Sequence, residues 1–154
     1  MGKIEWKTEL RRHFDSLRVI ERCHTETSGY FNQFCEFIAE SAFESLAGEL
    51  ALFRIKSCQK KNKGRDIRFS VCFPGTKDDQ FHYRIFLPKN AVELRLKLQV
   101  KARRTTTADY QTTDEDFMPG LFSLEVLKMD KDEVIHDIIE HYHRFCYETL
   151  TSPD

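Results

Sequence analysis

Apolar side chains in the first twenty residues recur at helical spacing. Trp6, Leu10, Phe14, Leu17 and Ile20 are three or four positions apart, and charged residues fill many of the positions between them. Such a stripe is typical of an amphipathic helix that buries one side. The pattern therefore predicts a first helix over this segment.

A second helix is predicted after a short interruption. Thr25, Thr27, Ser28 and Gly29 break the apolar spacing and offer side chains that could cap a new helix. Between residue 30 and Gly48, apolar residues lie on more than one side of this predicted helix. We therefore expect the second helix to be sandwiched between two surfaces and to end near Gly48.

From residue 53 onward, apolar and polar residues alternate. The alternation covers residues 53–58, 66–73, 80–87 and 93–103, and turn-forming residues separate the first three runs at 61–64 and 74–79. Half-buried strands at this spacing are typical of an antiparallel meander with one face toward water.

The last third of the chain begins with a segment that has no clear period. Residues 105–120 are rich in Thr and acidic side chains and predict a long loop. Phe122, Leu124 and Val126 indicate a fifth strand, and Asp130 begins a capping signal for a final helix.

These elements together predict one α+β domain over residues 1–154. It has two N-terminal helices, a four- to five-stranded antiparallel meander sheet and a C-terminal helix. Because every strand has one apolar face and every helix one apolar stripe, the helices should cover one face of the sheet in a two-layer fold.

The net charge of −1 hides a strong segregation of charge. Residues 54–104 carry 15 basic and four acidic side chains, whereas residues 105–154 carry three basic and 12 acidic ones. The predicted sheet is therefore basic, and the segment that follows it is acidic.

Strand alternation should direct this basic charge onto one surface. If the apolar residues face the helices, the other face presents His82 and the candidate anion-binding residues Arg54, Lys56, Lys60, Arg68, Arg84, Arg95, Lys97, Lys101 and Arg103. A face that is merely solvated usually mixes charges of both signs.

Two interpretations of this face remain open. In the first, Lys and Arg protect sheet edges from pairing, and the acidic loop and final helix neutralise the face within the molecule. In the second, the face binds phosphates or an acidic protein surface. Whether residues 105–120 and the final helix cover the basic face decides between them.

Our leading functional hypothesis is a non-catalytic nucleic-acid-binding or accessory protein. Phe86 and Tyr110 are the only aromatic residues expected near the basic face, so backbone contact with little sequence readout is expected. The alternative is an interaction or homo-oligomeric module whose basic face docks acidic surfaces.

A metal-dependent hydrolase is a third hypothesis. His136, Glu140 and His143 are spaced i, i+4 and i+7 on the predicted final helix, where they could ligate zinc. A polar helix flank gives the same spacing by chance, and no other motif supplies a fourth ligand. We therefore expect no catalytic residues, metal or cofactor.

The five cysteines include no C-x-x-C pair, which favours reduced thiols in a cytoplasmic protein. No apolar run is long enough to span a membrane, and the N-terminal residues do not form an export signal. We therefore expect no membrane partner.

Overall fold

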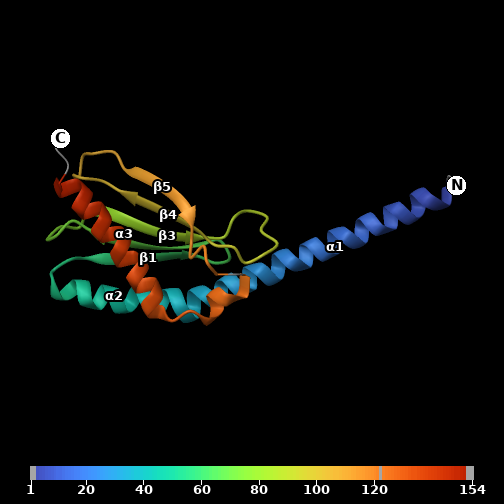
Figure 1. The fold of residues 1–154 in the computed structure, drawn as a ribbon, viewed down its shortest axis with the longest axis horizontal. Coiled ribbons are helices and arrows are strands. Elements are labelled where there is room, and N and C mark those ends of the chain that lie inside the picture. The colour runs from blue at the N-terminus through green and yellow to red at the C-terminus, as the bar shows by residue number, and fades with distance from the viewer. Residues whose placement is uncertain (1–2, 122, 152–154) are drawn as a thin grey trace.

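A computed structural model of the chain describes residues 3–121 and 123–151. One long helix leads into a five-stranded antiparallel sheet, and a C-terminal helix crosses the sheet (Figure 1). The elements in chain order are α1 (Lys3–Phe34), the π-helical turn η1 (Cys35–Ala39), α2 (Glu40–Leu52), β1 (Ser57–Asn62), β2 (Asp66–Cys72), β3 (Asp79–Phe86), β4 (Lys97–Ala102), β5 (Gln111–Asp116), the 3₁₀ helix η2 (Ser123–Lys128) and α3 (Lys131–Thr151). The predicted α+β class is confirmed.

The two predicted N-terminal helices are joined as one continuous helix, so the predicted break at residues 25–29 was wrong. The Thr25 hydroxyl donates to the Glu21 carbonyl oxygen one turn back, at 3.1 Å, instead of capping a new helix. Thr27 is buried on the same side as Phe31, so the stripe runs through the predicted break. The helix also continues past Gly48 to Leu52.

The sheet has the strand order β1-β2-β3-β4-β5, with every neighbouring pair antiparallel. The meander is therefore as predicted, but β1 begins later and β4 is shorter than the pattern predicted. β1 begins at Ser57 rather than at residue 53, because the chain turns at Arg54 with a left-handed backbone (φ 62°). β4 covers only residues 97–102 of the long fourth strand that the pattern predicted.

The fifth strand lies inside the segment that was predicted to be a loop. β5 pairs with β4 along six residues, although all its side chains are exposed. Backbone pairing rather than apolar burial therefore forms it. The strand expected at Leu124 and Val126 is instead the 3₁₀ helix η2, where Val126 is buried; Phe122 lies outside the described residues.

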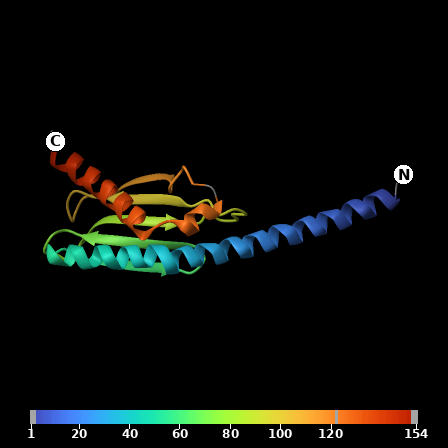
Figure 2. The same cartoon turned by 60° about the horizontal axis from the view of Figure 1, so that its bottom comes forward.

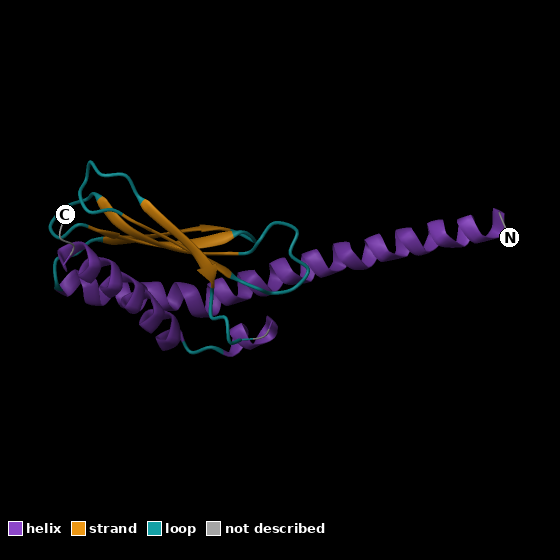
Figure 3. Cartoon of the chain, turned by 45° about the horizontal axis from the view of Figure 1, so that its top comes forward, coloured by secondary structure: helices purple, strands orange, loops and turns teal. Residues whose placement is uncertain are grey.

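The helices cover only one face of the sheet, as predicted (Figure 3). Phe43 of α2 packs on Phe69 of β2 with ring centroids 5.2 Å apart, and Tyr142 of α3 packs on Phe81 of β3 at the same distance. Among residues 3–121 and 123–151, no helix lies over the other face of the sheet.

The second half of the long helix is only partly sandwiched. It packs against the sheet and α3, but Phe37 points outward and is largely exposed. In the described part of the chain, no helix has the length and apolar content needed to cross a bilayer.

Candidate anion-binding surface

The strand register decides which side chains lie on the face without helices, here called the open face. Ile67, Phe69, Tyr83, Ile85 and Leu98 belong to the core, so the residues between them point to the other side. The open face carries Cys58, Lys60, Asn62, Asp66, Arg68, Ser70, His82, Arg84, Phe86, Lys97, Gln99, Lys101, Thr112, Asp114 and Asp116.

Three cations form a row across the first three strands. Lys60 of β1 is the register partner of Arg68 in β2, and Arg68 is the partner of Arg84 in β3. Lys101 lies in the next row, opposite His82. Like charges directly opposite each other destabilise a sheet. We call Lys60, Arg68, Arg84 and Lys101 the basic cluster.

Arg84 is held in place by its neighbours. Its Nε donates to Asp66 Oδ2 at 2.7 Å, and its guanidinium lies 4.5 Å from the centre of the Phe86 ring. Asp66 also accepts a hydrogen bond from Asn62 at 2.9 Å. The charge of Arg84 is therefore partly neutralised and its orientation is fixed.

Arg68 lacks such support. Its Nε is buried without a hydrogen-bond partner. Among the described residues, Lys60, Arg68 and Lys101 have no carboxylate within ion-pair distance. A buried unpaired donor costs about 1–3 kcal/mol. The open face therefore contains a cation that has a buried, unpaired Nε and no carboxylate partner among the described residues.

A depression of about 270 Å³ lies over this position. It is lined by Arg68, His82, Arg84, Gln99 and Lys101, which come from β2, β3 and β4. Three positive charges and one amide surround a space in which an anion could accept several hydrogen bonds. Arginine forks match the geometry of phosphate oxygens especially well.

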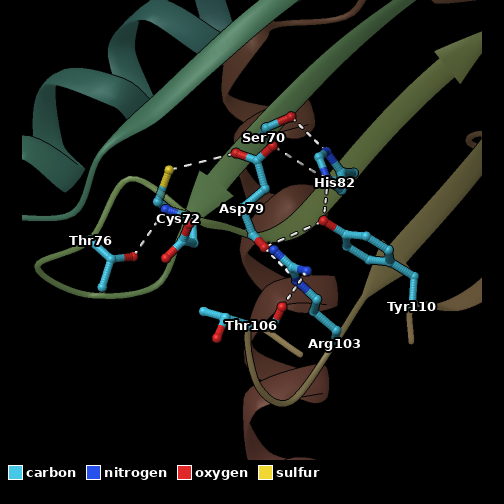
Figure 4. A network of polar contacts seen from close by, with 9 residues as sticks. Ser70, Cys72, Thr76, Asp79, His82, Arg103, Thr106 and Tyr110 are labelled. Carbon is cyan, nitrogen blue, oxygen red and sulfur yellow. Dashed lines mark hydrogen bonds and ion pairs between the residues drawn. The ribbon is translucent and has the colours of Figure 1, made fainter. Parts of the chain in front are cut away.

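His82 forms one wall of the depression and is itself well anchored (Figure 4). Its Nδ1 lies 2.7 Å from Ser70 Oγ, and its Nε2 lies 3.4 Å from Tyr110 Oη. Burial lowers the pKa of His82, and Arg68 is among the cations that lower it further, against the opposing effect of Asp79. The imidazole is therefore neutral at pH 7.

Ser70, His82 and Asp79 do not form a hydrolytic triad. The Ser70 side chain is only 1% exposed, so its hydroxyl cannot reach a substrate. Asp79 Oδ2 lies 3.9 Å from His82 Nε2, too far for a hydrogen bond. The Ser70–His82 hydrogen bond instead ties β2 to β3.

Two other basic residues that were predicted to lie on the open face already have partners within the protein. Lys97 forms an ion pair with Asp116 at the β4–β5 edge. Arg103 donates to the carbonyl oxygens of Asp79 at 2.8 Å and Thr106 at 3.0 Å, and it stacks 4.7 Å from the Tyr110 ring centre. Arg103 therefore holds the loop that leads to β5.

Arg54, Lys56 and Arg95 lie outside the strands. Arg54 is in the turn before β1, and Lys56 directly precedes that strand. Arg95 precedes β4, is 80% exposed and pairs with Glu93 at 2.9 Å. The structure thus brings Lys60, Arg68, Arg84 and Lys101 together and leaves these three at the margin.

The acidic segments border the open face without covering it. Asp114 and Asp116 of β5 extend the face beyond β4, where Asp114 accepts a hydrogen bond from Gln99 at 3.1 Å. α3 lies on the opposite face, where its Asp137 accepts a hydrogen bond from Tyr83 and its His141 pairs with Glu115. The basic cluster therefore remains accessible.

The proposed metal ligands give no site in the described part of the chain. His136, Glu140 and His143 are exposed on α3, and within residues 3–121 and 123–151 no three His, Cys, Asp or Glu side chains are grouped so that they could hold a metal ion. The five cysteines are free, and burial raises the pKa of Cys35 to about 12.

Only some of the residues that line and support the depression were predicted from the sequence. Gln99 and the anchoring role of Tyr110 were missed, because alternation identifies a face but not the neighbours across strands. Comparison of the chain with protein-family models, with curated proteins and with solved structures finds no match.

Proposed function

We propose that the open face binds the phosphate backbone of nucleic acid and catalyses no reaction. The observation that carries this proposal is Arg68, a cation that lines the depression on the open face and has no carboxylate within ion-pair distance among the described residues. A bound phosphate would neutralise the guanidinium charge and reduce the repulsion between Arg68, Lys60 and Arg84. The cost of keeping these cations together is thus offset when the ligand binds.

The charge distribution supports a particular path for the ligand. Lys60, Arg68 and Arg84 follow one another from β1 to β3, whereas Asp114 and Asp116 make the β5 edge acidic. A polyanion is therefore expected to cross β1, β2 and β3 and to avoid β5. Lys63 and Arg65, at the turn between β1 and β2, extend the positive charge at the start of this path.

The same face offers little for reading bases. Phe86 already stacks with Arg84, and Tyr110 stacks with Arg103, so neither ring is free for a base. Binding is therefore expected to depend on the phosphates and on salt rather than on sequence.

The test is the affinity of the full chain for a fluorescent mixed-sequence single strand, measured by anisotropy over a series of salt concentrations. Each phosphate contact contributes a slope of about −0.7 in log K against log salt, so four cations predict a slope of about −3. Substituting Arg68→Gln together with Lys101→Gln should reduce this slope to about half and weaken binding at every salt concentration.

Arg54→Gln together with Arg95→Gln is the matched control. It removes the same charge from residues outside the strands and should leave the affinity nearly unchanged. Absence of binding at low salt, or an equal loss in both variants, would contradict the proposal. Binding to polyglutamate but not to nucleic acid would assign the face to acidic protein partners instead.

A further inference from the structure

The first part of α1 projects away from the rest of the molecule as an isolated helix (Figures 1 and 2). Every residue from 5 to 22 is exposed, and we call this segment the arm. The head is the part of the described chain from residue 23 onward. His24 lies at their junction, where its Nε2 is 3.1 Å from the carbonyl oxygen of Asn90.

The arm has an apolar stripe with no partner in the described part of the chain. Its large side chains keep much of their surface in water: Trp6 52%, Leu10 47%, Phe14 53%, Leu17 40% and Ile20 43%. In proteins, most of the stability of a helix comes from packing of its apolar side. The arm therefore lacks the contacts that normally stabilise such a helix.

The stripe continues the side of the helix that the head buries. A spacing of three and four runs through Trp6, Leu10, Leu17 and Ile20, with His13 and His24 at the two positions between apolar residues. It leads on to Thr27, Phe31 and Phe34, all of which are buried. Sustained spacing of this kind is the pattern of a helix that pairs with another helix. The arm thus presents to solvent the same side that the head packs against its sheet.

We propose that the arms of two copies of this chain pair in antiparallel orientation and form a symmetric dimer. The pairing places Leu10 opposite Ile20 of the partner subunit and Leu17 opposite His13 of the partner subunit. Each arm then supplies the apolar partner that the other lacks. The proposal does not depend on anion binding by the basic cluster, although Arg84 of that cluster also lines the depression at the junction.

The exposed area fits a pair of arms. Large side chains present about 150–250 Å² when fully exposed, so the five stripe residues leave roughly 400–500 Å² of apolar surface on one arm. Two arms together approach the roughly 1,000 Å² that a specific interface requires. A single arm already reaches the size of the largest apolar patch found on typical monomers, about 300–600 Å².

Charge favours an antiparallel second copy. Lys7 and Glu21 flank the stripe on the same side, and they are equally far from Phe14 in the sequence. Two-fold pairing near Phe14 brings Lys7 next to the partner's Glu21, and Glu21 next to the partner's Lys7. A parallel pair does not make this contact, because the two residues are two heptads apart.

A depression at the junction of arm and head lies where the N-terminal end of the partner's arm would reach. It measures about 460 Å³ and is lined by residues that include His24, Ser28, Pro88 and Asn90. The antiparallel register brings Trp6 of the partner subunit beside His24, at the edge of this depression. The end of each arm therefore meets a space in the other head.

The charge balance of the arm argues against a lipid surface as the occupant. Residues 5–22 carry five basic and four acidic side chains. Helices that lie on membranes are rich in Lys and Arg on the polar side, and acidic residues weaken their attraction to anionic lipids. The mixed flanks of this arm suit another helix better.

Sedimentation equilibrium of the full chain over a range of protein concentrations tests the proposal. We expect a dimer that Leu10→Glu combined with Leu17→Glu converts to a monomer. Arg11→Ser combined with Arg18→Ser is the matched control on the polar side of the arm and should remain dimeric. Circular dichroism of each variant shows whether the head remains folded.

Charge exchange tests the orientation. Lys7→Glu or Glu21→Lys alone should weaken the dimer about tenfold, because each places two like-charge pairs in the interface. The double exchange should restore the wild-type affinity. With Cys23→Ser in the background, Lys7→Cys plus Glu21→Cys should form disulfides only between chains, since the two positions are about 21 Å apart on one helix.

Several results would overturn the proposal. A chain that stays monomeric at all concentrations has no partner of this kind, and binding of the arm to anionic vesicles instead would identify a lipid surface as its occupant. A dimer that survives the Leu10→Glu, Leu17→Glu change forms elsewhere. A dimer that the double charge exchange fails to restore is not antiparallel in this register.

Discussion

Arg68 of β2 lies directly opposite Arg84 of β3, and only Arg84 has a carboxylate partner in the described structure. Asp66, on the same strand as Arg68, binds Arg84 at 2.7 Å. Of the two adjacent arginines, the carboxylate of Asp66 therefore pairs with the one on the central strand β3. Both arginines line the basic depression, where Arg68 keeps its charge without a carboxylate partner among the described residues.

Replacing Arg68 with leucine should stabilise the protein. Arg68→Leu removes repulsion from Lys60 and Arg84 and also removes a buried donor without a partner, a gain of about 1 kcal/mol in the free energy of unfolding. Urea denaturation measures this change. Arg95→Leu, at an exposed position outside the strands, should change stability by less than about 0.5 kcal/mol. A destabilised Arg68→Leu variant would show that Arg68 has a structural role.

Replacing Asp66 with asparagine should have opposite effects on stability and binding. Asp66→Asn removes the ion pair of Arg84 and should lower the free energy of unfolding by about 1 kcal/mol. The freed Arg84 should raise the affinity for nucleic acid several-fold at low salt. Glu93→Gln gives the same change in net charge beside Arg95, and its affinity should stay close to that of the wild type. A fall in the affinity of folded Asp66→Asn would contradict this account.

Binding should strengthen as the pH falls toward the pKa of free His82, which lies below the ordinary histidine value of about 6.5. The pKa of free His82 is lowered first by burial and then by Arg68, Lys101 and Arg103, while Asp79 raises it. A phosphate in the depression counters these cations and raises the pKa of His82, so binding takes up a proton. Phosphodiesters stay ionised throughout this range. Calorimetry in buffers of different ionisation enthalpy measures the uptake, which should be absent in His82→Gln.

The stability of the free protein should follow the opposite trend with pH. Because the folded pKa of His82 is below its unfolded value, the unfolded chain binds more protons as the pH falls from 6.5. The contribution of His82 is complete above pH 6.5 and is lost as the pH falls through the folded pKa. Thermal unfolding of the wild type and His82→Gln should show this difference, and parallel curves would exclude it.

Tyr83 should anchor α3 to the sheet. It is fully buried and donates a hydrogen bond to Asp137, and burial, followed by the charge of Asp137, raises its pKa well above the usual value. Tyr83→Phe should cost about 1.5–3 kcal/mol, the range for a hydrogen bond to a charged group. Tyr147→Phe, on the exposed side of α3, is the control and should cost almost nothing.

Much of the fold follows from short-range patterns in the sequence. Alternation over residues 66–73 and 80–87 correctly identified β2 and β3, since core residues such as Phe69 and Tyr83 sit between polar ones. Asp130 correctly marked the start of α3, where its Oδ1 accepts a hydrogen bond from the Asp132 amide at 3.3 Å. These signals depend only on neighbours in the chain.

The errors arose where distant parts of the chain decide the structure. β5 has no apolar alternation and forms because the backbone of β4 offers an unpaired edge. Thr25 is a good capping residue, yet its hydroxyl binds within the helix while the head buries Thr27 and Phe31 on either side of Gly29. Local preference therefore gave way to packing.

The sequence predicted which face of the sheet carries the candidate site, but not which residues of that face lie close together. The alternation of side chains along the strands correctly placed Lys60, Arg68, Arg84 and Lys101 on one side of the sheet. It could not show that Arg103 is bound by two carbonyl oxygens or that Arg54 precedes the strand, because both depend on where loops turn.

The most direct test is how steeply the affinity for a single strand depends on salt in three proteins. The wild type and Arg54→Gln/Arg95→Gln should share a slope of about −3, and Arg68→Gln/Lys101→Gln should show about half of it. Equal slopes in all three, or an affinity that salt does not change, would show that the open face does not bind phosphates.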